Sequence, residues 1–371
     1  MKFVTAAIFL LMQIACVIVV APRGLPSSSR LPSDDGEGIT SGLNRIETKA
    51  PSSLDAVATS TMSVFESSAM PEVELKPGVI LAGSSMNLTL EKLFENNDVV
   101  RNICWSVDSS SLLVELENED ISIWEVESGN QWPPVIARGG SWSPNGSYLA
   151  LYSEGEVNLT ALKNEVGSTS FRVDGRIVSV DWAGDSQAVY VAIQNPARVD
   201  VLGVQGRGKQ AEISADRWER LQQIDVSTDG DLLAVMADGL YVVSLTSGRV
   251  EYENPGAQLF AWSPDGKRAA LWLDAQVLIL DTGGWGILQA IPVAESGTGA
   301  MAMGWSPNGE VIALSQGTQV WLLAVETGSE LHRTAGYPGG VRALAFSPDG
   351  KYLAIGAADR LVSLWKIDYL R

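Results

Sequence analysis

The sequence has little of the residues on which most catalytic and metal sites depend. It contains one histidine, His332, and no Cys-x-x-Cys pair, Gly-x-Ser-x-Gly turn, His-Glu-x-x-His pair or Walker-type glycine loop. Histidine is the usual general base near neutral pH and the commonest transition-metal ligand, so most zinc sites and Ser-His-Asp arrangements are excluded. We therefore expect a protein that is not an enzyme, with no catalytic residue, no bound metal and no cofactor.

Cysteine is equally scarce, and the two copies are poorly placed to bond to each other. Cys16 lies inside an N-terminal apolar run, whereas Cys104 lies in a candidate strand. Targeting segments are often absent from the mature protein. We therefore expect no intramolecular disulfide in the folded domain.

Basic residues are also few relative to acidic ones. The chain has 26 Lys and Arg against 44 Asp and Glu, a formal net charge of −18. Nucleic acids and anionic membrane surfaces are bound through basic footprints, so both are excluded as main partners. A protein partner, basic or neutral, fits this charge better, although the same charge also keeps an all-β protein soluble.

The N-terminal part differs in composition from the rest of the chain. Phe3 to Ala21 is almost unbroken in apolar character, and a helix of that length can cross a hydrocarbon core of about 30 Å. We interpret residues 1–21 as a signal peptide or an uncleaved signal-anchor, with lipidation at Cys16 as a third alternative. This places the protein outside the cytoplasm, membrane-anchored or secreted, with this segment as its only membrane contact. Residues 22–77 are rich in Ser, Pro and Gly and predict a disordered linker.

The remaining sequence repeats with a period of 36 to 44 residues. Each unit has an apolar strand that ends at an anchor residue, then a tight turn such as Ser-Pro-Asp-Gly, and then further strands. The anchors are Trp105, Trp142, Trp182, Val226, Trp262, Trp305 and Phe346. This period is typical of a four-stranded propeller blade, so residues 78–371 predict an all-β, seven-bladed β-propeller of four-stranded antiparallel blades, which we expect to be monomeric.

The conspicuous side chains of these units have structural explanations. Asp-Gly and Asn-Gly supply the positive φ angles of tight hairpin turns, which explains Asp229, Asp265 and Asp349 without any ligand. The anchor tryptophans repeat at blade spacing, and their burial removes much apolar surface from water. We therefore expect them in the core.

The last unit carries the clearest family resemblance. It runs Gly336-Tyr337, Val341 to Gly350, Asp359, and Leu361-Val-Ser-Leu-Trp365-Lys366. This pattern resembles a WD repeat, in which an Asp precedes the closing Trp by six residues, as Asp359 precedes Trp365. Tyr337 stands where that family has His, and Lys366 where it has the final Asp. The Ser-Pro-Asp-Gly turns are also similar to those of periplasmic propellers of the Tol system, which act through protein contacts.

One apolar segment, Asn87 to Phe94, precedes the first anchor, while the last unit ends after its third strand. We predict that this early segment supplies the outer strand of the last blade. Pairing the two ends closes the ring and removes an exposed sheet edge.

Two groups of charged residues are candidate partner contacts. Turns between second and third strands share one face of a propeller, and they carry several carboxylates. Summed on one face, such charges attract a basic partner. The second group belongs to the longest insertion, residues 207–223. The candidates are Glu117, Glu119, Asp120, Glu154, Glu156 and Asp238 in the first group, and Arg217 and Trp218 in the second.

The resemblance and the missing catalytic groups together indicate a non-catalytic protein-interaction scaffold outside the cytoplasm. The alternative is a propeller enzyme or small-molecule binder that holds a divalent metal on carboxylates in the central channel.

Overall fold

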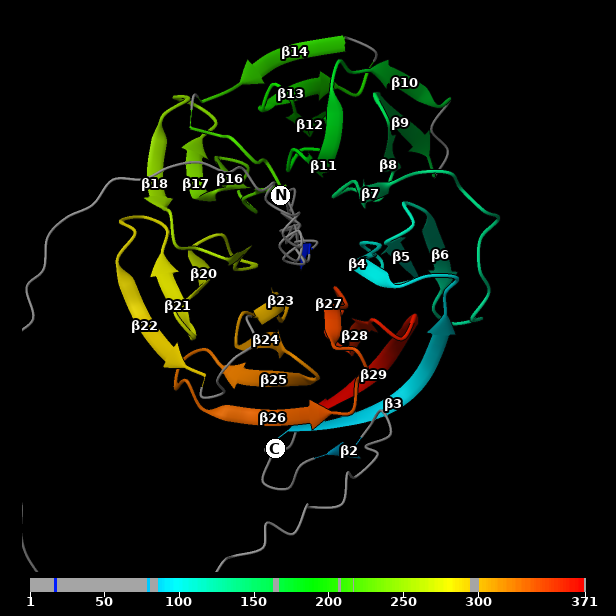
Figure 1. Ribbon diagram of the computed structural model, residues 1–371, viewed down its shortest axis with the longest axis vertical. Coiled ribbons are helices and arrows are strands. Elements are labelled where there is room, and N and C mark those ends of the chain that lie inside the picture. The colour runs from blue at the N-terminus through cyan, green and yellow to red at the C-terminus, as the bar shows by residue number, and fades with distance from the viewer. Residues whose placement is uncertain are drawn as a thin grey trace, which may run out of the picture. The chain divides into compact units, whose positions relative to one another are not determined.

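The computed structural model describes residues 17–18, 79–80, 86–162, 167–205, 208–215, 217–293 and 300–369. Seven antiparallel sheets follow one another around a common axis (Figure 1). Within the sheets of blades 2 to 5 the chain runs from an inner strand to an outer one, as the labels of β11 to β14 show. The predicted seven-bladed all-β propeller is confirmed.

The strands of blades 1 to 4 are as follows. Blade 1 contains β4 (Val100–Trp105), β5 (Ser111–Leu116) and β6 (Ile121–Glu125), and blade 2 contains β7 (Gly139–Trp142), β8 (Tyr148–Ser153), β9 (Glu156–Ala161) and β10 (Thr169–Arg172). Blade 3 contains β11 (Arg176–Trp182), β12 (Ala188–Gln194), β13 (Arg198–Gly203) and β14 (Gly208–Ile213). Blade 4 contains β15 (Gln223–Val226), β16 (Leu232–Ala237), β17 (Gly239–Ser244) and β18 (Val250–Asn254).

Blades 5 to 7 follow in the same order. Blade 5 contains β19 (Leu259–Trp262), β20 (Arg268–Leu273), β21 (Gln276–Asp281) and β22 (Ile287–Pro292). Blade 6 contains β23 (Ala300–Trp305), β24 (Val311–Gln316), β25 (Gln319–Ala324) and β26 (Glu330–Ala335). Blade 7 contains β27 (Val341–Phe346), β28 (Tyr352–Ala357), β29 (Leu361–Tyr369) and β3 (Met86–Glu95).

The ring closes as the sequence predicts. Strand β3, which precedes blade 1 in the sequence, pairs antiparallel with β29 of the last blade, in a register that runs from Leu361 opposite Glu95 to Tyr369 opposite Met86. His332 on β26 contacts the closing strand β3, because its Nδ1 lies 2.8 Å from the carbonyl oxygen of Met86, and its side chain is buried. The sole histidine thus lies on an outer strand.

Blade 1 departs from the predicted four-stranded pattern at its outer edge. Residues that follow β6 form isolated bridges with it, Ile121 with Val135 and Trp124 with Gln131, rather than a continuous ladder. Pro133 and Pro134 lie between these bridges and have no N–H to donate to a sheet. The fourth strand of this sheet is instead the two-residue β1 (Val17–Ile18), next to β4.

The predicted N-terminal helix is not supported. Of residues 1–21, only β1 is described, and it is extended rather than helical. The linker predicted for residues 22–77 lies outside the described residues, and β2 (Val79–Ile80) pairs with β26. In the part of the chain that the structure covers, no helix is long and apolar enough to span a membrane.

Cys104 on β4 is disulfide-bonded. The expectation that the fold holds no intramolecular disulfide is therefore wrong.

The core consists of seven apolar clusters rather than one central cluster. Each lies mainly between neighbouring sheets; one, for example, joins Trp105 and Val114 of blade 1 to Ala345 and Leu364 of blade 7. All predicted anchors are buried, with exposed fractions from 1% at Trp182 to 8% at Trp305. Each blade therefore depends on its neighbours for burial of its faces.

The repeated turns form as predicted. In the fifth blade, Ser263 Oγ donates to Asp265 Oδ1 at 2.6 Å and accepts from the Arg268 N–H, while Gly266 has φ of +68°. The same serine-to-carboxylate bond occurs at Asp229 and Asp349. These aspartates shape turns, and their carboxylates are engaged in doing so.

Candidate functional site

One face of the propeller gathers most of the predicted acidic residues. The turns between second and third strands contact the segments that link one blade to the next, for example through Val173 N to Gly155 O and Val341 N to Gly317 O, both 2.9 Å. We call the surface made by these turns and links the turn face. It carries Glu117, Glu119, Asp120, Glu154 and Asp238, whereas Glu156 lies half-buried at the start of β9.

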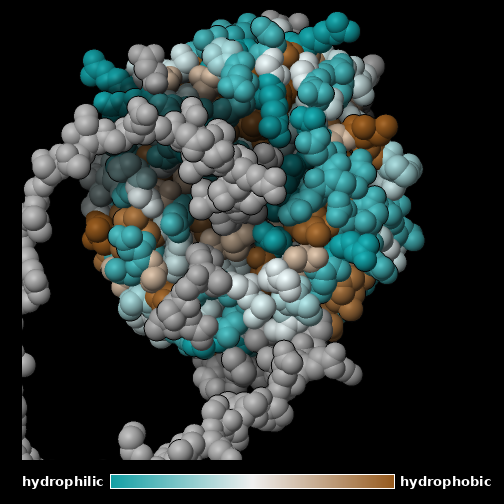
Figure 2. All heavy atoms as spheres, in the orientation of Figure 1, coloured by the Kyte–Doolittle hydropathy of each residue, from teal (hydrophilic) through white to brown (hydrophobic). Residues whose placement is uncertain are grey.

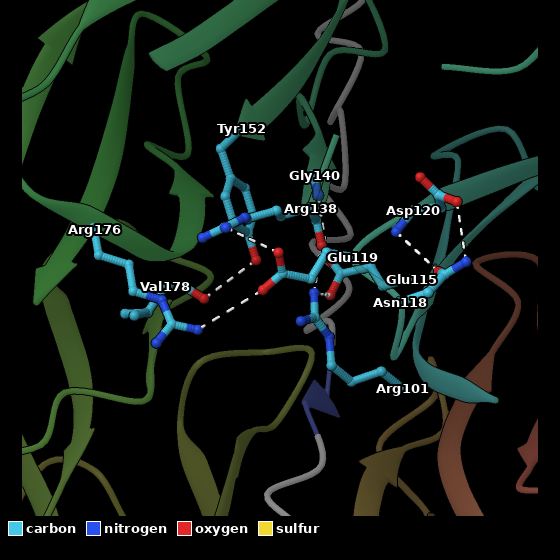
Figure 3. A network of polar contacts seen from close by, with 10 residues as sticks. All are labelled: Arg101, Glu115, Asn118, Glu119, Asp120, Arg138, Gly140, Tyr152, Arg176 and Val178. Carbon is cyan, nitrogen blue, oxygen red and sulfur yellow. Dashed lines mark hydrogen bonds and ion pairs between the residues drawn. The ribbon is translucent and has the colours of Figure 1, made fainter. Parts of the chain in front are cut away.

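The carboxylates on the turn face of blades 1 to 3 are joined by arginines (Figure 3). Glu119 sits in a left-handed turn conformation with φ of +68°, and its carboxylate lies 2.8 Å from Arg138 and 4.0 Å from Arg176. Arg138 also lies 4.0 Å from Glu154. Residues from three successive blades therefore form one charged network.

Buried polar side chains lie beneath the turn face and support this network. Glu115 on β5 is 2% exposed; one carboxylate oxygen lies 3.0 Å from Arg101 and the other accepts the Gly140 N–H at 3.0 Å. Arg101 also donates to the carbonyl of Arg138. The hydroxyl of Tyr152 donates to the carbonyl of Val178 in blade 3, and burial raises the pKa of this phenol, so it stays protonated. Glu115, Arg101 and Tyr152 each make a hydrogen bond toward the next blade, so these bonds hold neighbouring blades together beneath the network.

Not every acidic side chain on this face is neutralised. Glu117 is exposed, and Asp120 accepts a bond from the Asn118 side chain at 3.0 Å. Arg101, Arg138 and Arg176 were not among the residues predicted from the sequence. The turn face here is thus a mixed surface of carboxylates and guanidinium groups rather than a purely acidic ring.

The second group of candidates is also neutralised by pairing. Arg217 lies 2.8 Å from Glu253, and Arg220 lies 3.0 Å from Asp238. Trp218 is only 3% exposed and packs with Leu221 and Ile224, so its ring is part of the core in this structure. Arg217, by contrast, keeps 70% of its side chain exposed.

A buried pair of carboxyl groups lies between the inner strands of blades 3 and 4. Asp181 Oδ2 accepts the Val226 N–H at 2.7 Å. Burial raises the pKa of Asp181 to about 6, and burial together with the neighbouring Asp181 raises the pKa of Asp225 well above its ordinary value. Both groups therefore keep their protons to a higher pH than an exposed aspartate does.

This pair lies beside a very small cavity, about 10 Å³, which Asn102 and Glu115 also line. Such a volume holds roughly one water molecule. Within the described ranges, no three His, Cys, Asp or Glu side chains are placed to hold a metal ion.

The anchor indoles form the most regular polar feature of the ring. Trp105, Trp182, Trp262 and Trp305 each donate Nε1–H, at 2.9 to 3.1 Å, to a carbonyl on the inner strand of the preceding blade. The anchor of blade 4 is Val226, which has no indole, and there Asp181 of blade 3 accepts the backbone N–H instead. The carboxyl pair thus has a structural role at this boundary.

The last blade has a chain of side-chain hydrogen bonds at its closing tryptophan. Trp365 Nε1 donates to Ser363 Oγ at 2.9 Å, and the Tyr337 hydroxyl lies 3.3 Å from the same oxygen. Asp359 accepts the Leu361 N–H at 3.1 Å within its turn. Tyr337 therefore takes the place of the usual histidine while keeping the chain of bonds to the closing tryptophan.

Comparison with known proteins agrees with this geometry. The family model described as "WD40: WD domain, G-beta repeat" matches residues 328–366, which span β26 to β29. A search of curated proteins finds no match. The family match and the seven blades together confirm the resemblance to WD-repeat propellers.

Proposed function

Starting from a seven-bladed propeller of the WD-repeat kind, we propose that this protein is a non-catalytic platform for protein partners. WD-repeat propellers generally mediate protein–protein interaction. We assign the contact surface to the turn face of blades 1 to 3, where the charged network is held by buried bonds.

The observation that carries this assignment is the arrangement around Glu119. Arg138 and Arg176 fix its carboxylate from two neighbouring blades. Arginine is enriched in protein interfaces, and preorganised charges lose little freedom on binding. The exposed carboxylate of Glu117 and the partly exposed carboxylate of Asp120, both beside this network, favour a partner with basic groups. Figure 2 shows a largely hydrophilic surface on the face in view, with separate hydrophobic patches.

The experiment compares charge reversals on the turn face with charge reversals elsewhere on the propeller, both made in the full-length chain. The test variant carries Glu117→Lys and Asp120→Lys, which leave the Glu119 network intact. The control carries Asp231→Lys and Glu251→Lys, two exposed carboxylates of blade 4 away from this network. Partners cross-linked in the native host are identified, and their affinities for the purified variants are measured.

We expect the control to keep wild-type affinity and the test variant to bind at least about tenfold more weakly, with the difference shrinking in high salt. Equal affinity of both variants for every identified partner would refute the turn face as the contact surface.

We further propose that the platform acts outside the cytoplasm, membrane-anchored or secreted. The apolar run Phe3 to Ala21 supports this location. Protease added to intact cells should digest the protein if it is anchored outside, or the medium should contain it if it is secreted. Full protection inside intact cells, with none in the medium, would contradict this location.

The alternative of a carboxylate-held metal is motivated by the Asp181 and Asp225 pair. A calorimetric titration with calcium distinguishes it from the platform. We expect no saturable heat, because the described residues offer no group of three ligands. Stoichiometric calcium binding would favour the alternative.

A further inference from the structure

A second surface lies where the ring closes, on the side of the propeller opposite the turn face. A groove of about 1050 Å³ runs between blade 7 and blade 1. It is lined by the closing strand β3, by the turn that joins β4 to β5 and by the turn that follows β6. Because neighbouring strands are antiparallel, these turns lie at the strand ends opposite the turn face. We call this cavity the seam groove.

The floor of the seam groove is apolar and aromatic. Val126 and Leu364 are buried beneath it, at 8% and 1% exposure. Tyr352 is stacked on Trp105 at 6.4 Å, and Trp132 meets Trp142 edge-on at 6.0 Å. Both lining rings are held by buried tryptophans and are themselves partly exposed, so they can contact aliphatic side chains.

The rim of the seam groove is acidic. Glu91, Glu125 and Glu127 are exposed, and none of the three forms an ion pair with another residue of the described chain. The one cation in the lining, Lys92, donates its ammonium hydrogens to the backbone carbonyls of Val126 and Glu127. This distinguishes the rim from the turn face, where arginines pair with Glu119, Glu154 and Asp238.

The groove is open because blade 1 lacks a regular outer strand. Trp132 belongs to the segment that stands in that position. Its backbone N–H donates to the Ile123 carbonyl at 2.8 Å, but the segment forms isolated bridges with β6 rather than a continuous ladder. Pro133 and Pro134 cannot extend the ladder. An outer strand that paired with β6 along its whole length would place additional residues beside the groove and narrow its opening.

From these contacts we propose that the seam groove binds a basic segment of a partner protein, in which Lys or Arg side chains flank an aliphatic residue. The aliphatic residue packs on Tyr352 and Trp132, and the cations meet Glu91, Glu125 and Glu127. Long basic side chains suit such a site because their methylene stems cover apolar surface while their charged ends reach the rim. This proposal goes beyond the platform function and uses a separate surface.

The test uses a labelled eight-residue peptide that alternates arginine with leucine, and a matched peptide with glutamate in place of arginine. Binding to the full-length chain is followed by fluorescence anisotropy at low and high salt. The test variants are the triple Glu91→Gln, Glu125→Gln, Glu127→Gln, and the single Ser128→Arg, which places a cation at an exposed rim position. The control triple is Glu219→Gln, Asp231→Asn, Glu251→Gln, which removes the same charge from exposed sites elsewhere.

The expected result is saturable, salt-sensitive binding of the basic peptide only. We expect affinity about tenfold weaker in both test variants and unchanged in the control triple, since each exposed ion pair contributes modestly. An equal loss of peptide affinity in the test and control triples would mean that binding depends only on the net charge of the protein. That result would overturn the proposal. So would undiminished binding to the test variants, or the absence of saturable binding to the wild type. None of these outcomes depends on the turn face, which stays unaltered in the seam-groove variants.

Discussion

At the residue scale, the anchor tryptophans differ in one respect that can be measured. The indole of Trp262 donates to the carbonyl of Asp225 across a blade boundary, at 3.0 Å. The indole nitrogen of Trp142 is buried without a hydrogen-bond partner. Both rings are otherwise buried anchors at equivalent positions, 4% and 7% exposed.

We expect Trp262→Phe to lower the free energy of unfolding by about 1 kcal/mol more than Trp142→Phe. Both variants lose the same ring volume, but only Trp262→Phe loses a hydrogen bond and leaves a buried carbonyl without its donor. Urea unfolding of the two variants measures the difference. A cost at Trp142 as large as that at Trp262 would show that the indole hydrogen bond contributes nothing.

The buried carboxyl pair makes stability depend on pH. The folded pKa values of Asp181 and Asp225 lie above the ordinary value of 3.8, so the folded protein holds protons that the unfolded chain releases. The contribution of the pair is therefore fully present below about pH 4 and is lost as pH rises through 6 and beyond.

We expect Asp225→Asn to remove part of this loss, because the amide needs no proton to stay neutral. The variant should be more stable than the wild type at pH 8, by roughly 1 to 2 kcal/mol, and close to it at pH 4. Urea unfolding at pH 4, 6 and 8 gives both curves. Parallel curves for the two proteins would show that the pair does not titrate as described.

At the scale of elements, the closing strand β3 is the segment on which the ring depends. Leu88 is 2% exposed and belongs to the cluster between blades 6 and 7, whereas Leu90, two residues along the same strand, is 37% exposed. The backbone of both residues is paired with β29.

We expect Leu88→Ala to lower the free energy of unfolding by about 2 to 4 kcal/mol, and Leu90→Ala by less than about 1. The strand loses the same number of carbon atoms in both variants, so the comparison isolates burial. Thermal or urea unfolding is the measurement. Equal and small losses would mean that β3 does not close the ring in solution.

The elements that could be predicted from the sequence are those with local signals. Asp265-Gly266 and its equivalents mark turns, and Trp262 and its equivalents mark strand ends, so the number of blades follows from spacing alone. Closure by β3 follows from one unassigned apolar segment and one missing strand. Strand β14 falls inside the predicted insertion of residues 207–223, where its polar residues gave no strand pattern.

The candidate site could be predicted only in part, because its partners come from different blades. Glu119 was identified from its turn, but Arg138 and Arg176 meet it through tertiary packing, with no signal in the local sequence. Trp218 is in a segment with charged neighbours and was taken for a surface residue. The structure turns its ring into the blade 3 and 4 cluster.

At the scale of the whole molecule, every blade is packed between two neighbours and the two ends of the ring are paired. Open repeat arrays can unfold from their terminal repeats, whereas a closed ring offers no such terminus. We expect the propeller to unfold in a single transition. Far-ultraviolet circular dichroism and tryptophan fluorescence should then give the same midpoint in urea, whereas separate midpoints would indicate blades that unfold independently.

The order of the strands in the chain has a consequence for synthesis on the ribosome. Strand β3 leaves the ribosome before any of the seven inner strands, yet its partner β29 is made after all the other strands that the structure describes. For the whole of translation the exposed edge of β3 has no native partner, and the first blade has no completed neighbour on one side. A nascent chain that stops before Leu361 would keep an unpaired strand available to chaperones and proteases.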